Sequence, residues 1–405
     1  MNLDFIQNNV LTEIEKSVLS RIDEAESVDL LQSLVRIDTV NPPGNVEAAI
    51  ELCRGILARA GFDCRIAQLE AAKPNLIATL GSGIGPTLCL NAHLDVVPVG
   101  DLTAWHSAPF AAEIRNGRVY GRGALDDKAS VVAQVMAGLA VARSGIAIAG
   151  NLIVNSVADE EIGGPAGAAL IVGERHIAPD FVIVGEPTRN RVCVGERGGG
   201  LIRIEVRGRT AHGALPWEGA NAIEGMAVIL AALRTELWPK LEERSHPYFD
   251  HSSASVNIIE GGLKDNVVPD LCVASIDRRY IPGEDPDECL AELAQIAQST
   301  VRDLNGVSVE VCYSGEVNRA RMTDPGSPLV RSMQSANRKL GLATELTGFS
   351  MATDGRFFAA AGFPTIIYGP GDPKLAHVPN ESIGIDELMD ATRAYALAAV
   401  EILQN

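Results

Sequence analysis

His93 and Asp95 stand two residues apart, directly after an apolar run at 88–90 that is typical of a buried strand. Side chains two apart on an extended backbone point the same way, so Asp95 can hydrogen-bond one ring nitrogen of His93 while the other faces a metal ion. A carboxylate in that position is the usual support of a metal-bound imidazole. The pair is therefore a candidate metal ligand with its orienting acid, although such a short motif is weak evidence by itself.

Four further segments place acids or an imidazole after predicted strands or in loops. They are Asp126-Asp127-Lys128, Asp159-Glu160-Glu161, Glu186-Pro187-Thr188 and Ala376-His377-Val378-Pro379-Asn380-Glu381. Each has an ordinary explanation when taken alone, such as a helix N-cap for Asp126 or a solvated loop acid. Together they supply imidazoles and carboxylates without a cysteine, which suits Zn²⁺ and also Co²⁺ or Mn²⁺.

Charge balance favours two metal ions in such a site. Two Zn²⁺ ions would be neutralised by three carboxylates and one bridging hydroxide, with two neutral imidazoles as further ligands. The side chains in question are His93, His377, Asp126, Glu161 and Glu186. A buried site needs this balance because uncompensated charge is costly in a low dielectric. Paired metals that share a carboxylate and a water are a hydrolytic arrangement, and Glu160 is then left over as a general base for that water.

Length and charge limit the class of protein. The chain has 405 residues, more than one compact core usually holds, so two domains are expected. Its net charge of −18 argues against nucleic acid or an anionic membrane as the main partner. The seven cysteines include no Cys-x-x-Cys pair, so reduced thiols are expected. No signal peptide or transmembrane pattern is visible, and the expected location is cytoplasmic.

The elements that must position these residues follow two patterns. Strands alternate with helices up to about residue 184, which predicts an α/β domain with a mixed, mostly parallel sheet whose strand ends carry the site. Between 196 and 313 the order becomes strand, helix (220–237), strand, strand, helix, strand, as in a ferredoxin-like unit. We therefore predict a catalytic metal-binding domain over 1–195 and 314–405, interrupted by an inserted ferredoxin-like (βαββαβ) domain over 196–313.

Five ordered motifs carry a resemblance to a known family. The segments are HLD at 93–95, GRGALDDK at 121–128, DEE at 159–161, GEP at 185–187 and AHVPNE at 376–381. They resemble the motifs of the co-catalytic zinc aminoacylase/carboxypeptidase family, and in particular its acetylornithine deacetylase and succinyl-diaminopimelate desuccinylase branch. The resemblance implies that two sets of ligands share Asp126 as a bridge. These sets are His93, Asp126 and Glu186 for one zinc, and Asp126, Glu161 and His377 for the other.

The resemblance also implies roles outside the metal ligands. Asp95 would orient His93, Glu160 would activate the bridging water, and the Asp126–Asp127 peptide is expected to be cis. The inserted domain would serve as a lid and would form a homodimer. In that dimer His212 would reach the partner's active site and stabilise the oxyanion. Further substrate-binding residues implied by the resemblance are Asn257, Arg278, Thr353, Arg356 and Gly371.

The activity expected from this reading is that of a metal-dependent amide hydrolase, or deacylase, which removes an acyl group from an N-acylated amino acid or a similar small amide. An alternative keeps the same dinuclear chemistry in a dipeptidase or carboxypeptidase. A serine hydrolase built on Ser350 is disfavoured, because GFSMA lacks the second glycine of a nucleophile elbow. A non-catalytic descendant of the family would be expected to have lost Glu160 or a ligand, and none is missing.

Overall fold

The computed structural model describes residues 11–81 and 83–404, and it divides into two compact units. The first unit contains the chain up to Gly195, Met322–Phe349 and the residues from Thr353 onward. The second contains Glu196–Arg321 and Ser350–Ala352. Each unit has a hydrophobic core of its own, as expected for separately packed domains.

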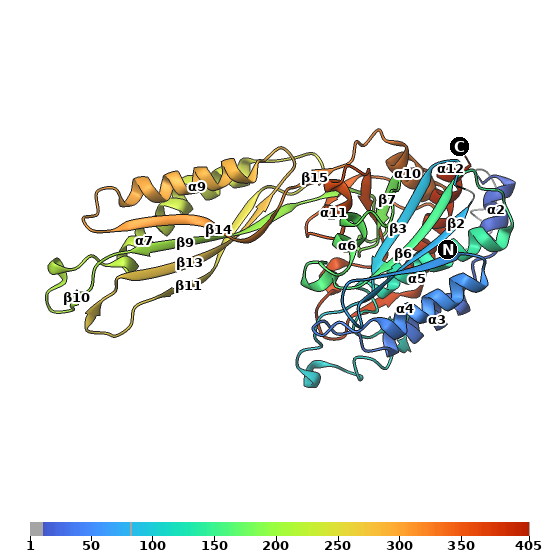
Figure 1. The fold of residues 1–405 in the computed structure, drawn as a ribbon, viewed down its shortest axis with the longest axis horizontal. Coiled ribbons are helices and arrows are strands. Elements are labelled where there is room, and N and C mark those ends of the chain that lie inside the picture. Colours follow the sequence, from blue (N-terminus) through green and yellow to red (C-terminus); the bar gives the residue numbers. More distant parts are fainter. Residues whose placement is uncertain (1–10, 82, 405) are drawn as a thin grey trace. The chain divides into compact units, whose positions relative to one another are not determined.

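A nine-stranded mixed sheet forms the centre of the first unit (Figure 1). Its order is β1 (Asp63–Gln68), β2 (Pro74–Gly81), β6 (Asn151–Val157), β3 (Thr87–His93), β7 (Phe181–Val184), β17 (Thr365–Ile367), β8 (Cys193–Glu196) and β15 (Arg321–Met322), with β16 (Thr347–Phe349) beside β8. The central strands β6, β3, β7 and β17 are parallel, while β1, β2 and β8 pair antiparallel with their neighbours. The predicted mixed α/β class is confirmed.

Helices cover both faces of this sheet. The helices of the first unit are α2 (Glu13–Leu19), α3 (Glu24–Arg36), α4 (Glu47–Arg59), α5 (Lys128–Ser144), α6 (Ala168–Gly173), α10 (Pro328–Leu340), α11 (Gly355–Ala360) and α12 (Ile385–Leu403). Helices α5 and α12 pack on each other and on β3 and β6, while α6 and α11 share the core of the other face. Residues 88–90 are fully buried because β3 is covered on both sides. Helix α5 is buried on all sides over residues 128–141, since it lies inside the unit, and most of these residues are apolar.

The parallel register brings three strand ends to one edge of the sheet. His93, the last residue of β3, pairs with Val157 at the end of β6, and Asn91 pairs with Val184 at the end of β7. The segments that follow β6 and β7 therefore leave the sheet beside His93. A small antiparallel sheet of β4 (Glu113–Arg115), β5 (Arg118–Tyr120) and β18 (Ser382–Gly384) joins the chain around residue 120 to the segment after His377.

The second unit is a four-stranded antiparallel sheet with helices on one face. Its elements are β9 (Gly198–Arg207), α7 (Ala222–Ala232), α8 (Trp238–Glu243), β11 (Ser253–Gly261), β13 (Leu271–Tyr280), α9 (Pro286–Val301) and β14 (Ser308–Asn318), in the sheet order β11-β13-β9-β14. Helices α7 and α9 pack against one face, and their core includes Ile202, Ile204 and Ile276 (Figure 1). A two-residue pair, β10 (Ala211–His212) and β12 (Val267–Val268), projects from the unit.

The helix predicted over 220–237 is longer in the structure. After α7 the chain makes a π turn over Leu233–Leu237 and continues as α8 to Glu243. Pro239 lies in the first turn of α8, where its missing N–H and fixed φ fit the start of a new helical segment. The sequence pattern detected the apolar face but not the local rewinding.

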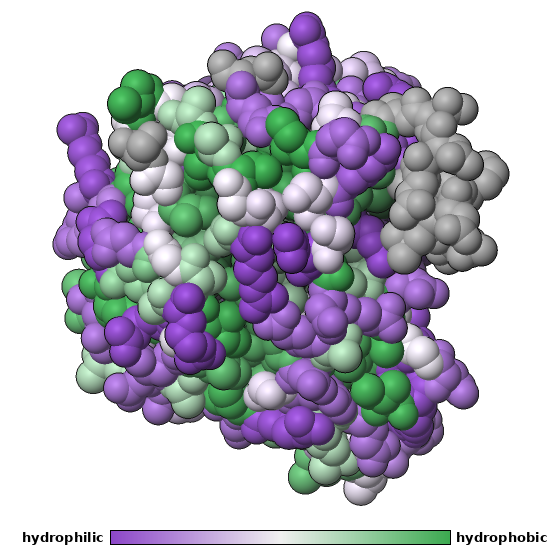
Figure 2. All heavy atoms as spheres, turned by 90° about the vertical axis from the view of Figure 1, so that its right-hand side faces the viewer, coloured by the Kyte–Doolittle hydropathy of each residue, from purple (hydrophilic) through white to green (hydrophobic). Residues whose placement is uncertain are grey.

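Among the residues that the structure describes, no helix is long and apolar enough to cross a bilayer. The face drawn in Figure 2 interleaves hydrophilic residues with smaller hydrophobic patches.

Candidate metal centre

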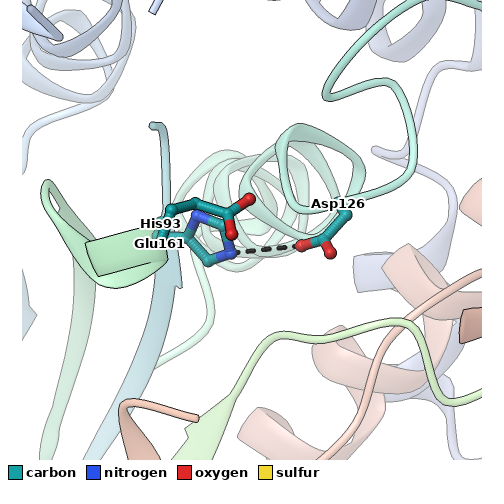
Figure 3. A group of neighbouring side chains, drawn as sticks. All are labelled: His93, Asp126 and Glu161. Atoms are coloured by element: carbon teal, nitrogen blue, oxygen red, sulfur yellow. Dashed lines mark ion pairs between the residues drawn. The ribbon is translucent and has the colours of Figure 1, made fainter. Parts of the chain in front are cut away.

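Asp126 lies between two histidines that are 284 residues apart in the sequence. Its Oδ1 is 3.2 Å from Nε2 of His93, and its Oδ2 is 3.2 Å from Nε2 of His377. The same nitrogen of His377 is 3.2 Å from Oε2 of Glu161. One ligand atom from each of His93, Asp126 and Glu161 lies within 4.8 Å of the others, and their polar ends converge in Figure 3. Folding thus brings four of the sequence-predicted metal ligands together.

His93 is oriented by the residue predicted to orient it, but mainly through the main chain. Its Nδ1 is 3.0 Å from the backbone oxygen of Asp95 and 3.5 Å from Oδ1 of the same residue. A ring nitrogen facing a carbonyl must carry a proton, so the hydrogen-bond network assigns the proton to Nδ1 and turns Nε2 toward Asp126. The carboxylate of Asp95 instead accepts the backbone N–H of Glu160 at 3.1 Å and that of Glu161 at 3.2 Å. Asp95 therefore joins the strand that carries His93 to the loop that carries both glutamates.

The loop that carries Asp126 is anchored by a residue to which the sequence reasoning gave no role. Oε1 of Glu381 accepts the backbone N–H of Leu125 at 3.0 Å and that of Asp126 at 3.1 Å. The same carboxylate pairs in the interior with Arg122. In the sequence, the role of Glu381 is indicated only by its position as the last residue of the motif AHVPNE. The Asp126–Asp127 peptide is cis, as the family resemblance implied.

The carboxylates near His93 outnumber the cations around them. Burial, with the charges of neighbouring acids, raises the pKa of Glu160, Glu161 and Glu186. Asp126 differs: burial favours its neutral form, but hydrogen bonds from His377 and His93 hold its pKa below the usual value. The Asp126 and Glu161 carboxylates in turn raise the pKa of His377 to about 10.

Bound cations would offset the repulsion between these buried carboxylates and favour their ionised forms. Oε1 of Glu161 is buried and has no hydrogen-bond partner among the described residues, which fits an oxygen that would bind a metal. Glu186 leaves the end of β7, is buried and lies in the electric field of Asp126 and Glu160. Oxygen and imidazole donors of this kind suit Zn²⁺, and the donor set therefore fits a divalent metal centre.

One of the predicted substrate residues, Arg356, lies close to Glu160, and a second, Thr353, contacts Arg356. Arg356 donates to the backbone oxygens of Thr353 and Gly163 at 2.8 Å each, and its Nη1 is 3.9 Å from Oε1 of Glu160. Its guanidinium is thus held by carbonyls and faces the candidate base. The side chain of Thr353 accepts the backbone N–H of Gly355 at 2.9 Å.

Gly371 lies beside the Asp126 loop rather than at an open surface. It adopts φ +91°, and a Cβ at this position would lie 2.7 Å from Cδ1 of Leu125. Only glycine fits this backbone geometry without displacing Leu125.

In the second unit, strand alternation separates two neighbouring arginines. Arg278 points to the helix-covered side, where Nη2 is 2.6 Å from Oε1 of Glu284, and only 2% of Arg278 is exposed. Arg279 points to the open face, pairs with Asp277 at 2.8 Å and lines a cavity of about 170 Å³ with Gly200. The sequence-predicted substrate contact Arg278 is thus paired with Glu284, and its neighbour Arg279 is paired with Asp277. Counting the period of two from the buried Ile276 would have distinguished them.

The other predicted residues of the second unit are exposed. Asn257 stands where the register of β11 shifts between Val256 and Ile258, and its Oδ1 accepts the hydroxyl of Ser255 at 2.7 Å. Nδ1 of His212 accepts the backbone N–H of Ala214 at 3.0 Å, so the neutral ring carries its proton on Nε2 and can donate it outward.

Comparison with known proteins places this site in a family of metal-dependent hydrolases. A family model described as Peptidase family M20/M25/M40 matches residues 89–401. The chain belongs to this family, which confirms the resemblance drawn from the five motifs.

Curated relatives from two bacteria match nearly the whole chain. Succinyl-diaminopimelate desuccinylase of Caulobacter sp. (strain K31) is 30% identical, covering 91% of this chain and 94% of its own. Acetylornithine deacetylase of Myxococcus xanthus is 32% identical, covering 91% and 96%. A Bacillus subtilis structure described as a dinuclear metal binding peptidase from the M20 family matches with a TM-score of 0.69 at 16% identity, covering 94% of this chain and 98% of its own. At that identity the structure supports the fold alone.

Proposed function

We propose that this protein is a deacylase that uses two divalent metal ions to hydrolyse the amide of an N-acylated amino acid or a related small molecule. The observation that carries the proposal is the position of Asp126, with one carboxylate oxygen toward each of two histidines. A carboxylate that faces two ligand sets in this way suits a bridge between two metals. The desuccinylase and the deacetylase among the relatives support acyl-amide substrates.

The proposed ligands follow the two sets that share Asp126. One metal would take His93, Asp126 and Glu186, and the other Asp126, Glu161 and His377. We propose zinc as the native metal, and Co²⁺ or Mn²⁺ would also accept these donors. When bound, the metal pair would polarise the substrate carbonyl and lower the pKa of a water molecule.

Glu160 is the proposed general base and acid. Its carboxylate belongs to the same loop as Glu161, and the backbone N–H groups of both are held by Asp95. Glu160 would accept the proton of the attacking water and pass it to the leaving amine. Arg356, 3.9 Å from Glu160, would keep that carboxylate oriented and favour its ionised form between the two transfers.

An acyl amino acid has a carboxylate of its own, and two arginines of β13 are candidates to bind it. Arg278 is buried against Glu284, whereas Arg279 lies on the open face of its sheet, pairs with Asp277 and lines a cavity to which Asp277 and Glu316 also contribute. A guanidinium binds a carboxylate through two parallel hydrogen bonds, which would select acyl amino acids over uncharged amides. Substrate contacts by Asn257, Arg278, Thr353, Arg356 and Gly371, the homodimer, and the action of His212 on a partner subunit remain predictions.

A dipeptidase or carboxypeptidase is the second candidate, because the family model that matches residues 89–401 is described as a peptidase family. The two candidates differ in the acyl group that they accept. A panel of N-acetyl, N-succinyl and N-formyl amino acids, assayed beside dipeptides, distinguishes them. Metal content measured on the same preparation tests the shared chemistry. A metal-free preparation that stays fully active on any of these amides contradicts both.

A further inference from the structure

The amide group of Asn41 bridges two buried carboxylates near His93, those of Asp95 and Asp159. Nδ2 of Asn41 is 2.7 Å from Oδ2 of Asp95 and 3.1 Å from Oδ1 of Asp159. Both acids are fully buried, and 2% of Asn41 is exposed. Carboxylates only accept hydrogen bonds when ionised, so the group that faces both must be the NH₂ of Asn41, with both of its protons engaged.

Each of these carboxylates holds part of the loop that carries the glutamates. Asp95 accepts the backbone N–H groups of Glu160 and Glu161. Asp159 precedes Glu160 in the left-handed conformation, at φ +73°, and its Oδ2 accepts the backbone N–H of Ala166 at 3.0 Å. The two acids thus fix the loop at both ends.

Charge explains why an amide is needed at this point. Lys73 donates to Oδ1 of Asp159 at 2.6 Å and so supplies one positive charge for two buried negative ones. Among the residues that the structure describes, Asp95 faces the amide of Asn41, two backbone N–H groups and the ring of His93. Without the amide of Asn41 the two carboxylates would face each other with no proton between them, and like charges in the interior repel strongly.

The backbone around Asn41 is built to hold this side chain in place. Its N–H donates to the backbone oxygen of Val96 at 2.8 Å, which ties it to the segment directly after Asp95. Gly44 has φ +76°, and a Cβ there would lie 2.8 Å from Cγ of Asn41. Glycine at 44 therefore leaves the space that the amide occupies.

We propose that Asn41 is a positioning residue for the metal centre: its amide clamps Asp95 to Asp159 and thereby sets the loop that carries Glu160 and Glu161. The inference rests on the proposed function, because it takes Glu160 as the base and Glu161 as a ligand. The residues Pro42-Pro43-Gly44 that follow Asn41 are typical of a break between two helices, and this contact gives the segment a role in the site.

The test compares Asn41→Ala with Asn337→Ala. Asn337 is a matched control, since its buried amide also donates twice, at 2.9 Å to the backbone oxygen of Asn190 and at 2.7 Å to that of Ala343. The first measurement is amide hydrogen exchange of the metal-free proteins. We expect the amides of Glu160 and Glu161 to exchange about tenfold faster in Asn41→Ala and unchanged in Asn337→Ala. Asn41→Ser keeps one donor and serves if the alanine variant does not fold, with an intermediate effect expected.

The second measurement is Zn²⁺ affinity by competition with a chelator. Asn41→Ala should bind zinc about 10- to 100-fold more weakly, the usual loss when support behind a metal ligand is removed. Asn337→Ala should keep wild-type affinity. Unchanged exchange and affinity in a folded Asn41 variant overturn the inference, as does an equal loss in the control. A wild-type protein that binds no zinc contradicts the proposed function instead, and the exchange comparison still decides the role of Asn41.

Discussion

The carboxylate of Glu381 accepts the backbone N–H of Asp126 at 3.1 Å, although the two residues are 255 positions apart. Glu381 closes the segment that carries His377, and Asp126 lies between His377 and His93. This hydrogen bond therefore joins two of the loops that must meet to form the metal centre. Glu381 is also paired with Arg122, and both side chains are buried.

Removing that anchor should cost stability. In Glu381→Ala the guanidinium of Arg122 stays buried without its carboxylate, and we expect the free energy of unfolding to fall by about 3–5 kcal/mol. Urea denaturation of the metal-free protein measures this. Glu26→Gln breaks an exposed pair with Arg143 and should cost about 0–1 kcal/mol. Similar losses in the two variants would show that the buried pair contributes no more to the free energy of unfolding than the exposed pair.

Glu160→Gln should separate catalysis from metal binding. The amide cannot accept the water proton, so kcat should fall about 10²- to 10⁴-fold while the unfolding midpoint and the metal content stay at wild-type values. Glu161→Gln is the partner experiment, because it should lower metal affinity first. Steady-state kinetics with metal analysis on the same samples provide the measurement. A Glu160→Gln enzyme within a few-fold of wild type would falsify the proposed base.

Metal affinity should rise with pH. In the metal-free protein the Asp126 and Glu161 carboxylates raise the pKa of His377 from 6.5 to about 10. This ion pairing contributes stability that is complete below pH 6.5 and is lost as pH rises toward 10. A metal ion must displace the same proton, so apparent affinity should increase by about tenfold per pH unit across that window. Chelator competition at several pH values measures it, and His377→Gln should flatten the dependence. A flat wild-type curve contradicts the proposed ligand.

The neighbouring arginines should behave differently. Arg279→Met should raise KM for acyl amino acids with little change in unfolding, because it removes a cation from the open face of the sheet. Arg278→Met should instead lower stability by about 1–3 kcal/mol, because Glu284 loses one buried cationic partner and keeps Arg244. Kinetics and denaturation on both variants provide the comparison. A change in KM confined to Arg278→Met would show that Arg278, rather than Arg279, contacts the substrate.

The sequence by itself determined the elements and the residue types of the site. The alternation of strands and helices predicts the mixed sheet, and a period of two predicts which side of β9 packs on helices. His93 ends one strand and several acids follow others, and the carboxyl ends of these strands share one sheet edge, so their convergence follows from topology. The strand and helix positions are local features, and the shared edge depends on parallel pairing; the pattern of apolar residues predicts both.

Tertiary structure alone decided which groups support the site. The Asp95 carboxylate binds the backbone of Glu160 and Glu161 rather than chiefly the ring of His93, Glu381 holds the main chain of Asp126, and Asn41 joins two acids. Each contact links a side chain to a distant main-chain or carboxylate group. Such contacts leave no periodic signal in the sequence, because they depend on where loops of irregular conformation meet after the sheet has formed.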